Sequence, residues 1–327
     1  MQDLGQGSGG VWRRTDALKA VTRGVERSQL YDGSWVSPYP GVQCDGGFEM
    51  SPERWAFAGV LASRGNLLAE LPKDLSALGA IACGRDAARV LGYPLIDDDD
   101  PATGAVDHLQ HDVAVWTHAR PLTSRPRVPT DPVHVLNRHQ LVLGDGDLMR
   151  LESGLWVTTH VRSLYDLTAL VSREALVCAM DFALHEELVT TAELQAFIAG
   201  HSGWRAVTAF TAAVELSDGR AESPHETLTR LLLKPHWPEL EPQVELLSGS
   251  GELVARFDHA DEELRLAVES DGKRFHDALR DRVRDRRTES YRWWTERVSW
   301  WEVRCRQEQT LRRVLGARDR RRRQLAA

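Results

Sequence analysis

Cysteine is scarce in this chain of 327 residues, and the few cysteines form no recognisable pattern. Cys44, Cys83, Cys178 and Cys305 lie far apart, and no two of them make a CxxC pair. A zinc ribbon needs such pairs, and a disulfide-stabilised domain needs densely spaced cysteines, so neither class is indicated. We expect all four to be reduced residues of the protein core.

Signals for export and for membrane insertion are also absent. The start of the chain, MQDLGQGSGG, has neither the basic nor the apolar region of a signal peptide. No window offers the roughly 18 uninterrupted apolar residues that a spanning helix requires. We therefore expect a cytoplasmic protein without a membrane partner.

Several catalytic and nucleotide-binding motifs are missing. The chain contains no GxxxxGK[ST], no GxGxxG embedded after a strand and no GxSxG. These absences remove the commonest motif-based nucleotide-binding and hydrolase classes. We also find no internal repeat.

The charge of the chain is unevenly distributed. The formal net charge is −7, but residues 280–323 hold sixteen arginines and seven acidic residues. Such a local positive excess suits contacts with phosphate groups. A solvated helix face with partly compensated charge explains the same composition equally well.

Length and composition predict an α+β multidomain protein. At 42% hydrophobic residues, the chain is long enough for two or three domains with their own cores. Composition and pattern divide it into an N-terminal segment 1–45, a mixed helical and strand segment 46–218, and a C-terminal segment 219–327.

The N-terminal segment reads as two short helices followed by a hairpin. We expect Thr15 to cap the first helix and Thr22 to cap a second one that runs to Leu30. The stretch DGSWVSPYPGV has the composition of a turn and hairpin. Helix, helix and hairpin in this order are typical of the DNA-reading end of a winged helix-turn-helix.

Two arginines of the second helix are candidate DNA contacts. Arg23 and Arg27 are four residues apart and so share one helix face. Arginines on exposed helix faces are common, however, and by themselves these two are more typical of ordinary surface residues.

The middle segment mixes both types of element. SPERWAFAGVLAS, HVRSLYDLTALV, SREALVCAMDFALHEEL and TTAELQAFI have helical periodicity, whereas DVAVWTHA and PVHVLN read as strands. This segment also contains a polar cluster that superficially resembles a metal site: Asp107, His108, His111 and Asp112. We interpret it as surface polarity in a loop, because no second ligand group follows at a known spacing.

The C-terminal segment begins with a strong helix start. Ser223 is a good N-cap, Pro224 occupies the first helical position, and Glu226 stands three residues after the cap. This is the capping-box spacing, and it explains Glu226 without any functional role.

Three alternating runs follow, and they predict a strand meander: QVELL, ELVARFD and LRLAVESD. If Phe257 and Leu266 face the core, Asp258, Glu269 and Asp271 project together on the opposite face. A divalent cation, Mg²⁺ or Mn²⁺, would relieve their mutual repulsion, whereas a solvated sheet face would need none.

The register of that meander is an obstacle to a shared cation. With HADEE as the turn, a symmetric hairpin about residues 261 and 262 leaves Asp258 and Glu269 four positions out of register. That offset corresponds to roughly 13 Å along the strands, so a bend, bulge or skewed turn has to close it.

The ordered set Glu226, Asp258, VESDG, His276 and RVRDRRTESYRWW leading into VSWWEVRC resembles a known family. It is similar to endonuclease-like domains related to very-short-patch-repair nucleases, within the PD-(D/E)xK superfamily. The resemblance covers residues 221–306 and implies a restriction-endonuclease-like αβββαβ domain. It further implies Mg²⁺ near Asp258 and Glu269, with Glu226 arranging the site and His276 as an acid or base.

Two positions depart from the superfamily pattern. Asp271 stands where the superfamily has a lysine, a change shared with the repair-nuclease branch. Val298 and Ser299 replace the glycine that usually precedes the last strand, a change that would only reshape the local turn.

The N-terminal and middle segments carry a second resemblance. VWRRTDAL, TRGVERSQLYDGSWVSPYPGVQ and their order resemble the winged-helix start of the AbiE-type abortive-infection antitoxin family. GLWVTTHVRSLYDLTALVSREALVCAMDFALHEELVT is similar to the region that joins such a start to nuclease-like domains in actinobacterial proteins.

The resulting hypothesis is a DNA-binding protein with Mg²⁺-dependent endonuclease activity. Asp258 and Glu269 would hold the metal, and Lys273 and Arg287 would contact phosphate groups. A rival hypothesis is a non-enzymatic regulator or antitoxin with a degenerate nuclease-like domain. A third is a protein that neutralises a cognate toxin or binds another defence-system protein.

Overall fold

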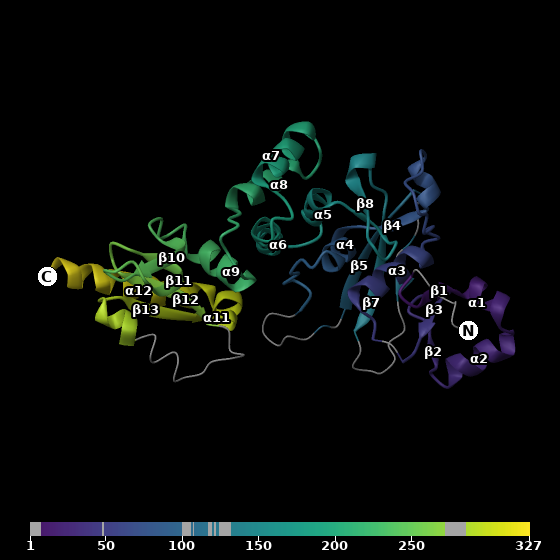
Figure 1. Ribbon diagram of the computed structural model, residues 1–327, viewed down its shortest axis with the longest axis horizontal. Coiled ribbons are helices and arrows are strands. Elements are labelled where there is room, and N and C mark those ends of the chain that lie inside the picture. Colours follow the sequence, from purple (N-terminus) through teal and green to yellow (C-terminus); the bar gives the residue numbers. More distant parts are fainter. Residues whose placement is uncertain are drawn as a thin grey trace. The chain divides into compact units, whose positions relative to one another are not determined.

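The computed structural model describes residues 8–47, 49–99, 106, 108–116, 120, 122–123, 132–271 and 286–327. The chain forms two compact units, each built from segments that are discontinuous in sequence (Figure 1). Unit 1 comprises Met1–Asp98, Ala105–Ser172 and Ala192–Phe210; unit 2 comprises Asp99–Gly104, Arg173–Thr191 and Thr211–Ala327. Both units combine helices with sheets, so the protein belongs to the α+β class.

Unit 1 begins with two short helices and a small antiparallel sheet. The elements are β1 (Val11–Arg13), α1 (Arg14–Ala20), α2 (Arg23–Tyr31), β2 (Trp35–Val36) and β3 (Val42–Asp45). The strand order is β1-β3-β2. The expected hairpin is therefore present as β2 and β3, and β1 adds a third strand to it.

The caps of the two helices differ from each other. Thr22 caps α2 as expected, because its hydroxyl accepts a hydrogen bond from the amide of Val25 at 3.4 Å. The expectation for Thr15 was wrong: α1 already begins at Arg14, and no side chain caps it. Arg13 ends β1 and leads directly into the helix, so the strand sets the start of α1 without a capping hydroxyl.

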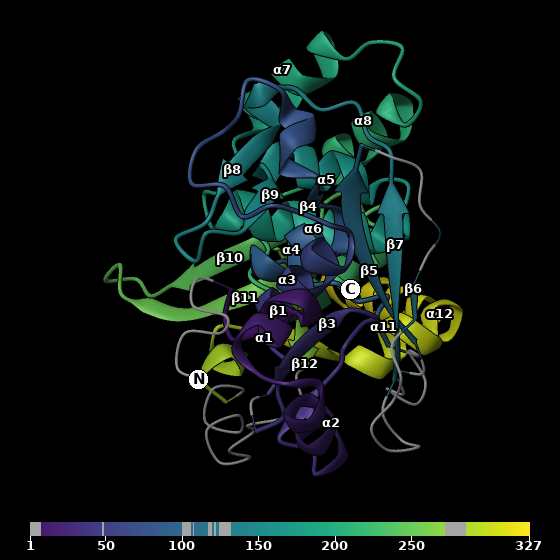
Figure 2. The same ribbon diagram turned by 90° about the vertical axis from the view of Figure 1, so that its right-hand side faces the viewer.

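A six-stranded mixed sheet forms the main layer of unit 1. Its order is β6-β7-β5-β4-β9-β8, with parallel pairs β5–β7 and β4–β9. The strands are β4 (Ala80–Ala82), β5 (His108–Val115), β6 (Leu122–Thr123), β7 (Val133–His139), β8 (Leu148–Arg150) and β9 (Trp156–Thr158). The long neighbouring strands β5 and β7 are seen in Figure 2.

Unit 1 contains further helices besides α1 and α2. They are α3 (Pro52–Ala62), α4 (Gly84–Val90), α5 (His160–Leu167) and α7 (Thr191–Gly200), with short 3-10 turns at Leu75–Leu78 and Asp145–Asp147. Helix α3 contacts β1 and β3 as well as β4 and β5. Its fully buried Phe57 belongs to the same core cluster as Val42 of the small sheet and Val113 of the large one, so one core serves both sheets.

Unit 2 is built on a four-stranded sheet in the order β10-β11-β12-β13. The strands are β10 (Glu241–Leu247), β11 (Leu253–Asp261), β12 (Leu266–Asp271) and β13 (Trp294–Ser299). The first two pairings are antiparallel and the last, between β12 and β13, is parallel. A parallel neighbour requires a crossover, and residues 286–290, just before β13, are helical.

The helices of unit 2 are α6 (Arg173–His185), α9 (Pro224–Leu233), α11 (Trp300–Cys305) and α12 (Gln307–Ala326); α8 (Val207–Leu216) runs from unit 1 into unit 2. Helix α9 contacts α6, α11 and α12 as well as strands β11 and β12 (Figure 1). Its start follows the expectation, with the Ser223 hydroxyl accepting from the amide of Glu226 at 3.3 Å and Pro224 in the first turn.

The turn between β11 and β12 lies later than the sequence predicted. His259, Ala260 and Asp261 belong to β11 and are at most 3% exposed, and the turn occupies residues 262–265. The carboxylate of Asp261 explains the difference, because it accepts from the indole of Trp237 at 2.8 Å and from the amide of Leu264 at 2.9 Å. A polar residue that sequence reasoning assigns to a turn is here a buried acceptor.

The stretch after β13 is a helix, whereas the resemblance led us to expect the last strand after Ser299. The strand is Trp294–Ser299, and WWEVRC forms α11. Ser299 and Glu302 make a reciprocal capping box at its start, with the Ser299 amide donating to Glu302 at 2.8 Å. The glycine expected before the last strand is therefore not needed at Val298, which is a fully buried strand residue.

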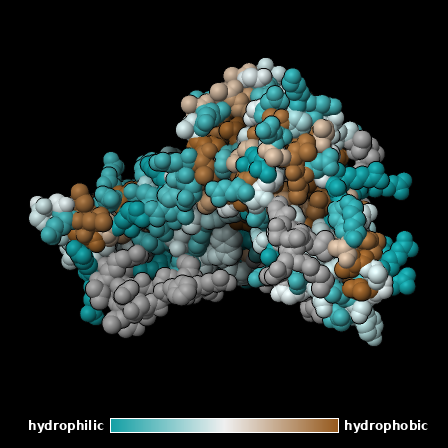
Figure 3. All heavy atoms as spheres, turned by 45° about the vertical axis from the view of Figure 1, so that its right-hand side comes forward, coloured by the Kyte–Doolittle hydropathy of each residue, from teal (hydrophilic) through white to brown (hydrophobic). Residues whose placement is uncertain are grey.

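The surface carries its apolar groups in separate places. Figure 3 shows hydrophilic side chains spread over this face, with apolar ones gathered in several separate patches. Exposed large apolar residues include Tyr31, Val142 and Trp294. Among the described residues, no helix has both the length and the apolar character needed to cross a membrane. Cys44, Cys83 and Cys178 are buried free thiols, and Cys305 is partly buried.

Candidate functional site

The register of the unit 2 sheet brings the first two predicted carboxylates together. His259 pairs with Val268 at the end of the β11–β12 ladder, and Asp258 and Glu269 are the next residue on each strand beyond that last pair. Residues directly opposite in an antiparallel pair have Cβ atoms about 4.5–5.5 Å apart and share a face. The four-residue offset expected from the sequence is therefore absent, because the turn lies at residues 262–265.

The backbone next to this pair confirms the close approach of the strands. The amide of Ser270 donates a hydrogen bond to Oδ2 of Asp258 at 2.7 Å. Glu269 is only 6% exposed, whereas Asp258 and Asp271 are half-buried. Burying a carboxylate is costly unless positive charge or hydrogen-bond donors compensate it, so Glu269 does not belong to a solvated sheet face.

Strand β13 adds a cation on the other side of Glu269. In the parallel ladder Glu269 pairs with Arg297 and Asp271 pairs with Ser299. Paired residues of neighbouring strands lie on the same face of the sheet, so Glu269 and Arg297 share one face. A guanidinium in this position compensates part of the negative charge.

The predicted residue Glu226 is occupied by local hydrogen bonds. Its Oε1 accepts from the Ser223 hydroxyl at 2.8 Å, and its Oε2 accepts from the amide of Glu222 at 3.0 Å and the amide side chain of Gln243 at 2.8 Å. Glu226 thus stabilises the start of α9 and ties it to β10. This is the structural role that the capping-box spacing predicted.

The remaining predicted residues of this region divide into two groups. His276 and Lys273 lie outside the described residues, as does Gly272. Arg287 is described, and it is an exposed residue of the helical stretch 286–290. Among the described residues, no group of three or more His, Cys, Asp or Glu side chains is arranged to hold a metal ion.

Two opposed carboxylates nevertheless fit a magnesium ion. Mg²⁺ is commonly held by one or two carboxylates, with waters and substrate phosphate oxygens completing its octahedral shell. Asp258 and Glu269 supply hard oxygen donors from adjacent strands. The donor set is therefore of the kind that Mg²⁺ or Mn²⁺ accepts, although it is too small to form an all-protein cage.

The N-terminal arginines lie as the helix spacing predicts. Arg23 and Arg27 are exposed on α2, and neither makes an ion pair with another described residue. The helix is fixed by Glu26 on its buried side, which accepts from Arg14 at 2.5 Å and from Gln43 at 2.6 Å. The hydrogen bond from Arg14 lowers the pKa of Glu26, so it stays ionised.

The arginine-rich C-terminal helix α12 uses part of its charge internally. Arg313 bridges Glu296 and Glu302 at 2.8 and 3.0 Å, and Arg321 donates to the carbonyl groups of Leu264 and Arg292. Other arginines of the helix are exposed: Arg312, Arg320, Arg322 and Arg323. The positive excess is thus partly structural and partly available at the surface.

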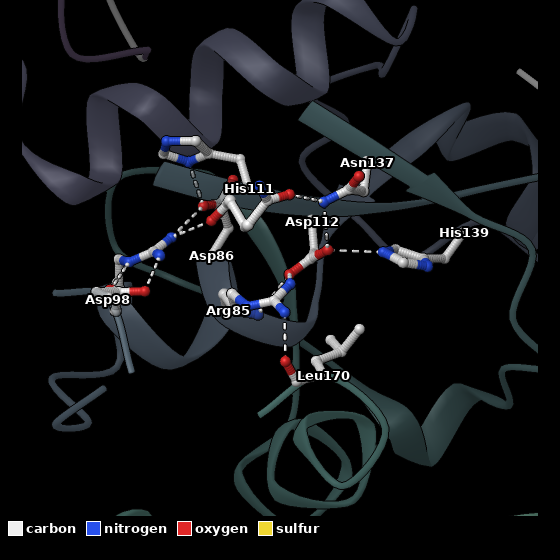
Figure 4. Close-up of polar contacts among 10 residues, drawn as sticks. Arg85, Asp86, Asp98, His111, Asp112, Asn137, His139 and Leu170 are labelled. Atoms are coloured by element: carbon white, nitrogen blue, oxygen red, sulfur yellow. Dashed lines mark hydrogen bonds and ion pairs between the residues drawn. The ribbon is translucent and has the colours of Figure 1, made fainter. Parts of the chain in front are cut away.

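Unit 1 contains a polar network that the sequence reasoning missed. His111 and Asp112 lie in strand β5 at 2% and 0% exposure, so their interpretation as loop surface polarity was wrong; Asp107 is outside the described residues. In the sequence, the apolar residues of AVW indicate strand β5, whereas the polar residues in the first part of that strand give no such indication. Figure 4 shows the network around these two residues.

Asp112 is the centre of one half of this network. One carboxylate oxygen accepts from His139 at 2.7 Å, and the other accepts from the guanidinium of Arg85 at 2.9 Å and its amide at 3.1 Å (Figure 4). Burial opposes ionisation, but the His139 hydrogen bond and the Arg85 charge outweigh it and lower the pKa of Asp112. Gly84 permits this contact, because its φ of +51° and the nearby Asp112 side chain leave no room for a Cβ.

The other half of the network joins two histidines to Asp86. His111 binds Asp86 at 2.5 Å through Nδ1 and His134 at 2.8 Å through Nε2, and Trp55 stacks on His134 at 3.6 Å. Arg89 approaches the same Asp86 oxygen at 3.3 Å. The arrangement explains how several buried polar groups are satisfied between α3, α4 and the sheet.

Comparisons with known proteins give distant relatives without an assigned activity. The uncharacterized proteins MT2308 and Rv2248 of Mycobacterium tuberculosis (strains CDC 1551 / Oshkosh and ATCC 25618 / H37Rv) are each 26% identical to this chain over 218 residues. The aligned region covers 65% of this chain and 72% of each relative. No family model matches the chain, and no solved structure matches it.

Proposed function

We propose that the protein binds DNA and cleaves phosphodiester bonds with the help of Mg²⁺ or Mn²⁺. The observation that carries this proposal is the end of the β11–β12 ladder, where the pair His259–Val268 and the hydrogen bond from the Ser270 amide to Asp258 bring Asp258 near Glu269. Two neighbouring carboxylates, one buried and one half-buried, are a reasonable arrangement for a divalent cation.

The order of elements in unit 2 supports the proposal. A helix, three antiparallel strands, a helical stretch and a fourth strand parallel to the third follow one another in α9, β10, β11, β12, residues 286–290 and β13. This is the order expected of the αβββαβ endonuclease-like domain that the sequence resembles. Asp258 and Glu269 lie on the two central strands of that sheet.

In this mechanism the residues of the chain bind and orient the scissile phosphate. A bound divalent ion would polarise the phosphate and lower the pKa of an attacking water. Arg297, next to Glu269 in the ladder, is positioned to balance charge, and exposed Arg287 to contact the nucleic acid backbone. His276 keeps the acid–base role that the resemblance implies, and Lys273 keeps the phosphate-binding role of the hypothesis.

The N-terminal elements support the DNA-binding half of the proposal. Strand β1 precedes the two helices, and β2 and β3 follow them and complete a three-stranded antiparallel sheet; this order suits a winged helix-turn-helix in which α2 would be the recognition helix. Its exposed Arg23 and Arg27 are four residues apart and so face the same side. Each would form a phosphate or base contact.

A regulator or antitoxin without nuclease activity is the second candidate function. The observation that favours it is the engagement of Glu226 in three local hydrogen bonds, which give this acid a structural role at the start of α9. Such a protein would use the same DNA-binding arginines and would bind a cognate toxin or defence-system protein through its nuclease-like domain.

Binding of Mn²⁺, measured by electron paramagnetic resonance, separates the two candidates. The nuclease proposal predicts one bound ion per chain that Asp258→Ala removes and that the exposed control Asp145→Ala retains. Unchanged Mn²⁺ binding in Asp258→Ala, or none in the unmodified protein, contradicts the nuclease and leaves the regulator.

A further inference from the structure

A cavity of about 500 Å³ opens within unit 1. It is bordered by the segment after β7, by α5 and by the segment before α8. Its apolar wall includes Leu141, Leu170 and Trp204, and its polar wall includes His139 and Asp166. This size and this mixture of an apolar body with a few polar groups are typical of small-molecule sites.

Asp166 has an unsatisfied oxygen at this cavity. Its side chain is 6% exposed, and its Oδ1 accepts from Nε of Arg162 at 2.9 Å. Its Oδ2 is buried and has no hydrogen-bond partner among the residues that the structure describes. A buried acceptor without a partner costs about 1–3 kcal/mol, so a ligand that donates to it would recover that cost.

Arg162 does not provide the missing donor: its Nη1 is directed elsewhere, and no hydrogen bond from Arg162 reaches Oδ2 of Asp166. It donates to the carbonyl group of Val142 at 2.7 Å and to the carboxylate of Asp147 at 3.2 Å. Its guanidinium also lies over the ring of Trp204, 5.3 Å from the centroid. Arg162 therefore fixes Asp166 and Trp204 in place and leaves the second oxygen of Asp166 to another group.

The neutral ring of His139 presents a second acceptor to the same cavity. The pKa of Asp112 is lowered, and its ionised carboxylate accepts a hydrogen bond from Nε2–H of His139. In the neutral ring this fixes Nδ1 as an acceptor, and Nδ1 makes no hydrogen bond to a described residue. Figure 4 shows the His139 ring directed at Asp112, with Leu170, another cavity residue, nearby.

The carboxylate at the cavity favours a ligand with positively charged N–H donors, because charge-assisted hydrogen bonds are the stronger ones. Among the charged residues that line the cavity, Arg162 is bonded to Asp166, and Arg205 is exposed, so water screens its charge. Two acceptors and an apolar wall with an indole together define the occupant.

We propose that this cavity binds a small planar organic cation with paired N–H donors, of the amidine or aminopyridine class. Its N–H groups donate to Oδ2 of Asp166 and Nδ1 of His139, and its planar body packs against Trp204 and the leucines. The site is independent of the proposed nuclease chemistry, since all of its residues belong to unit 1.

Benzamidine is a suitable probe, with the isosteric anion benzoate as its counterpart. Titration of the full-length protein by calorimetry or saturation-transfer NMR should give saturable benzamidine binding and at least ~10-fold weaker benzoate binding. Asp166→Asn should weaken benzamidine binding at least ~10-fold, corresponding to the loss of one charged hydrogen bond. The exposed control Asp145→Asn should leave it unchanged.

A second variant keeps the test decisive if Asp166→Asn alters the fold. Ala169 borders the cavity and is exposed, so Ala169→Trp fills the space without entering the core. Benzamidine binding should disappear in Ala169→Trp. Three results would each overturn the proposal. They are equal affinity for benzamidine and benzoate, benzamidine binding that survives both variants, and no benzamidine binding at about 10 mM, ten times the 1 mM dissociation constant of a weak fragment.

Discussion

At the scale of single residues, buried carboxylates are the most informative groups in this protein. Glu226, Asp112 and Asp166 are all acids in contact with donors, yet they differ in what remains unsatisfied. Glu226 has three donors, Asp112 has a cation and a histidine, and Asp166 has one guanidinium for two oxygens. Function is therefore to be sought where donors are lacking.

The first prediction concerns Asp166 and pH. Burial raises the pKa of Asp166 to about 6; the neighbouring Asp147 carboxylate also raises it, while Arg162 and His139 oppose the shift. The folded protein thus binds the proton more tightly than the unfolded chain, and this contribution is lost as pH rises through 6. Between pH 4 and 7 the unfolding free energy should fall by about 2 kcal/mol from this group.

The measurement is urea unfolding of the unmodified protein and of Asp166→Asn across that pH range. The asparagine variant lacks the titration, so its stability relative to the unmodified protein should rise by about 2 kcal/mol from pH 4 to pH 7. A difference that stays constant with pH would show that Asp166 is not shifted.

The second prediction concerns Glu226. Gln can accept from Glu222 and Gln243 through its oxygen and donate to Ser223 through its amide, so Glu226→Gln should cost only ~1 kcal/mol. Glu226→Ala leaves those donors without their acceptor and should cost more, about 2 kcal/mol. Thermal unfolding of the two variants checks this order, and a Gln variant as unstable as the Ala variant would contradict it.

At the scale of elements, helix α9 depends on a buried ion pair with α6. Asp181 of α6 accepts from Arg230 at 2.7 Å, from Thr227 at 2.7 Å and from the amide of Asp218 at 2.7 Å. Asp181→Ala leaves the buried Arg230 without its carboxylate, and removing one partner of such a pair costs about 3–5 kcal/mol.

The urea midpoint of Asp181→Ala should therefore fall strongly, while the exposed control Glu186→Ala should change little. Hydrogen exchange should report the loss locally, in the amides of α6 and α9. Equal midpoints for the two variants would mean that this pair does not hold the two helices together.

A further element-scale prediction concerns α2 and DNA. Arg23→Ala combined with Arg27→Ala should weaken binding to duplex DNA and reduce the salt slope by about 0.9 for each lost phosphate contact. Arg150→Ala combined with Arg173→Ala removes the same charge from other exposed positions and serves as the control. Identical slopes for both double variants would exclude α2 as the DNA-binding element.

Elements were predictable where local signals agree with packing. The Thr22 and Ser223 caps and the helical periodicities follow from nearby residues. The alternation expected of β11 and β12 is not seen in their burial, because Leu253 is 52% exposed while Val254 is buried. Asp261 was misread because its polarity is typical of a turn, while its partner Trp237 is distant in sequence. WWEVRC was misread because its capping box, Ser299 and Glu302, lies at the strand end.

The candidate sites were likewise only partly predictable from nearby residues. The approach of Asp258 to β12 was not predictable, because it depends on the register, which a turn displaced by a few residues decides. The His111 and Asp112 network and the cavity at Asp166 depend on residues from several elements. No spacing in the sequence indicates such long-range contacts.

At the scale of the whole molecule, each unit has its own sheet and its own candidate chemistry. Unit 1 carries the exposed arginines of α2 and the cavity; unit 2 carries the opposed carboxylates and the arginine-rich α12. The proposed function assigns DNA recognition to the first and phosphodiester cleavage to the second. The relatives in Mycobacterium tuberculosis share 26% of the aligned residues and provide natural variants for the same assays.

Cleavage of plasmid and single-stranded DNA tests the central claim most directly. With Mg²⁺ or Mn²⁺ the unmodified protein and the control Asp145→Ala should produce nicked or shortened products, and EDTA should abolish them. Asp258→Ala and Glu269→Gln should lose at least ~100-fold in rate, since each removes a donor from the proposed metal site. Cleavage that persists in EDTA or in Asp258→Ala, or no cleavage by the unmodified protein with either metal, would contradict the account.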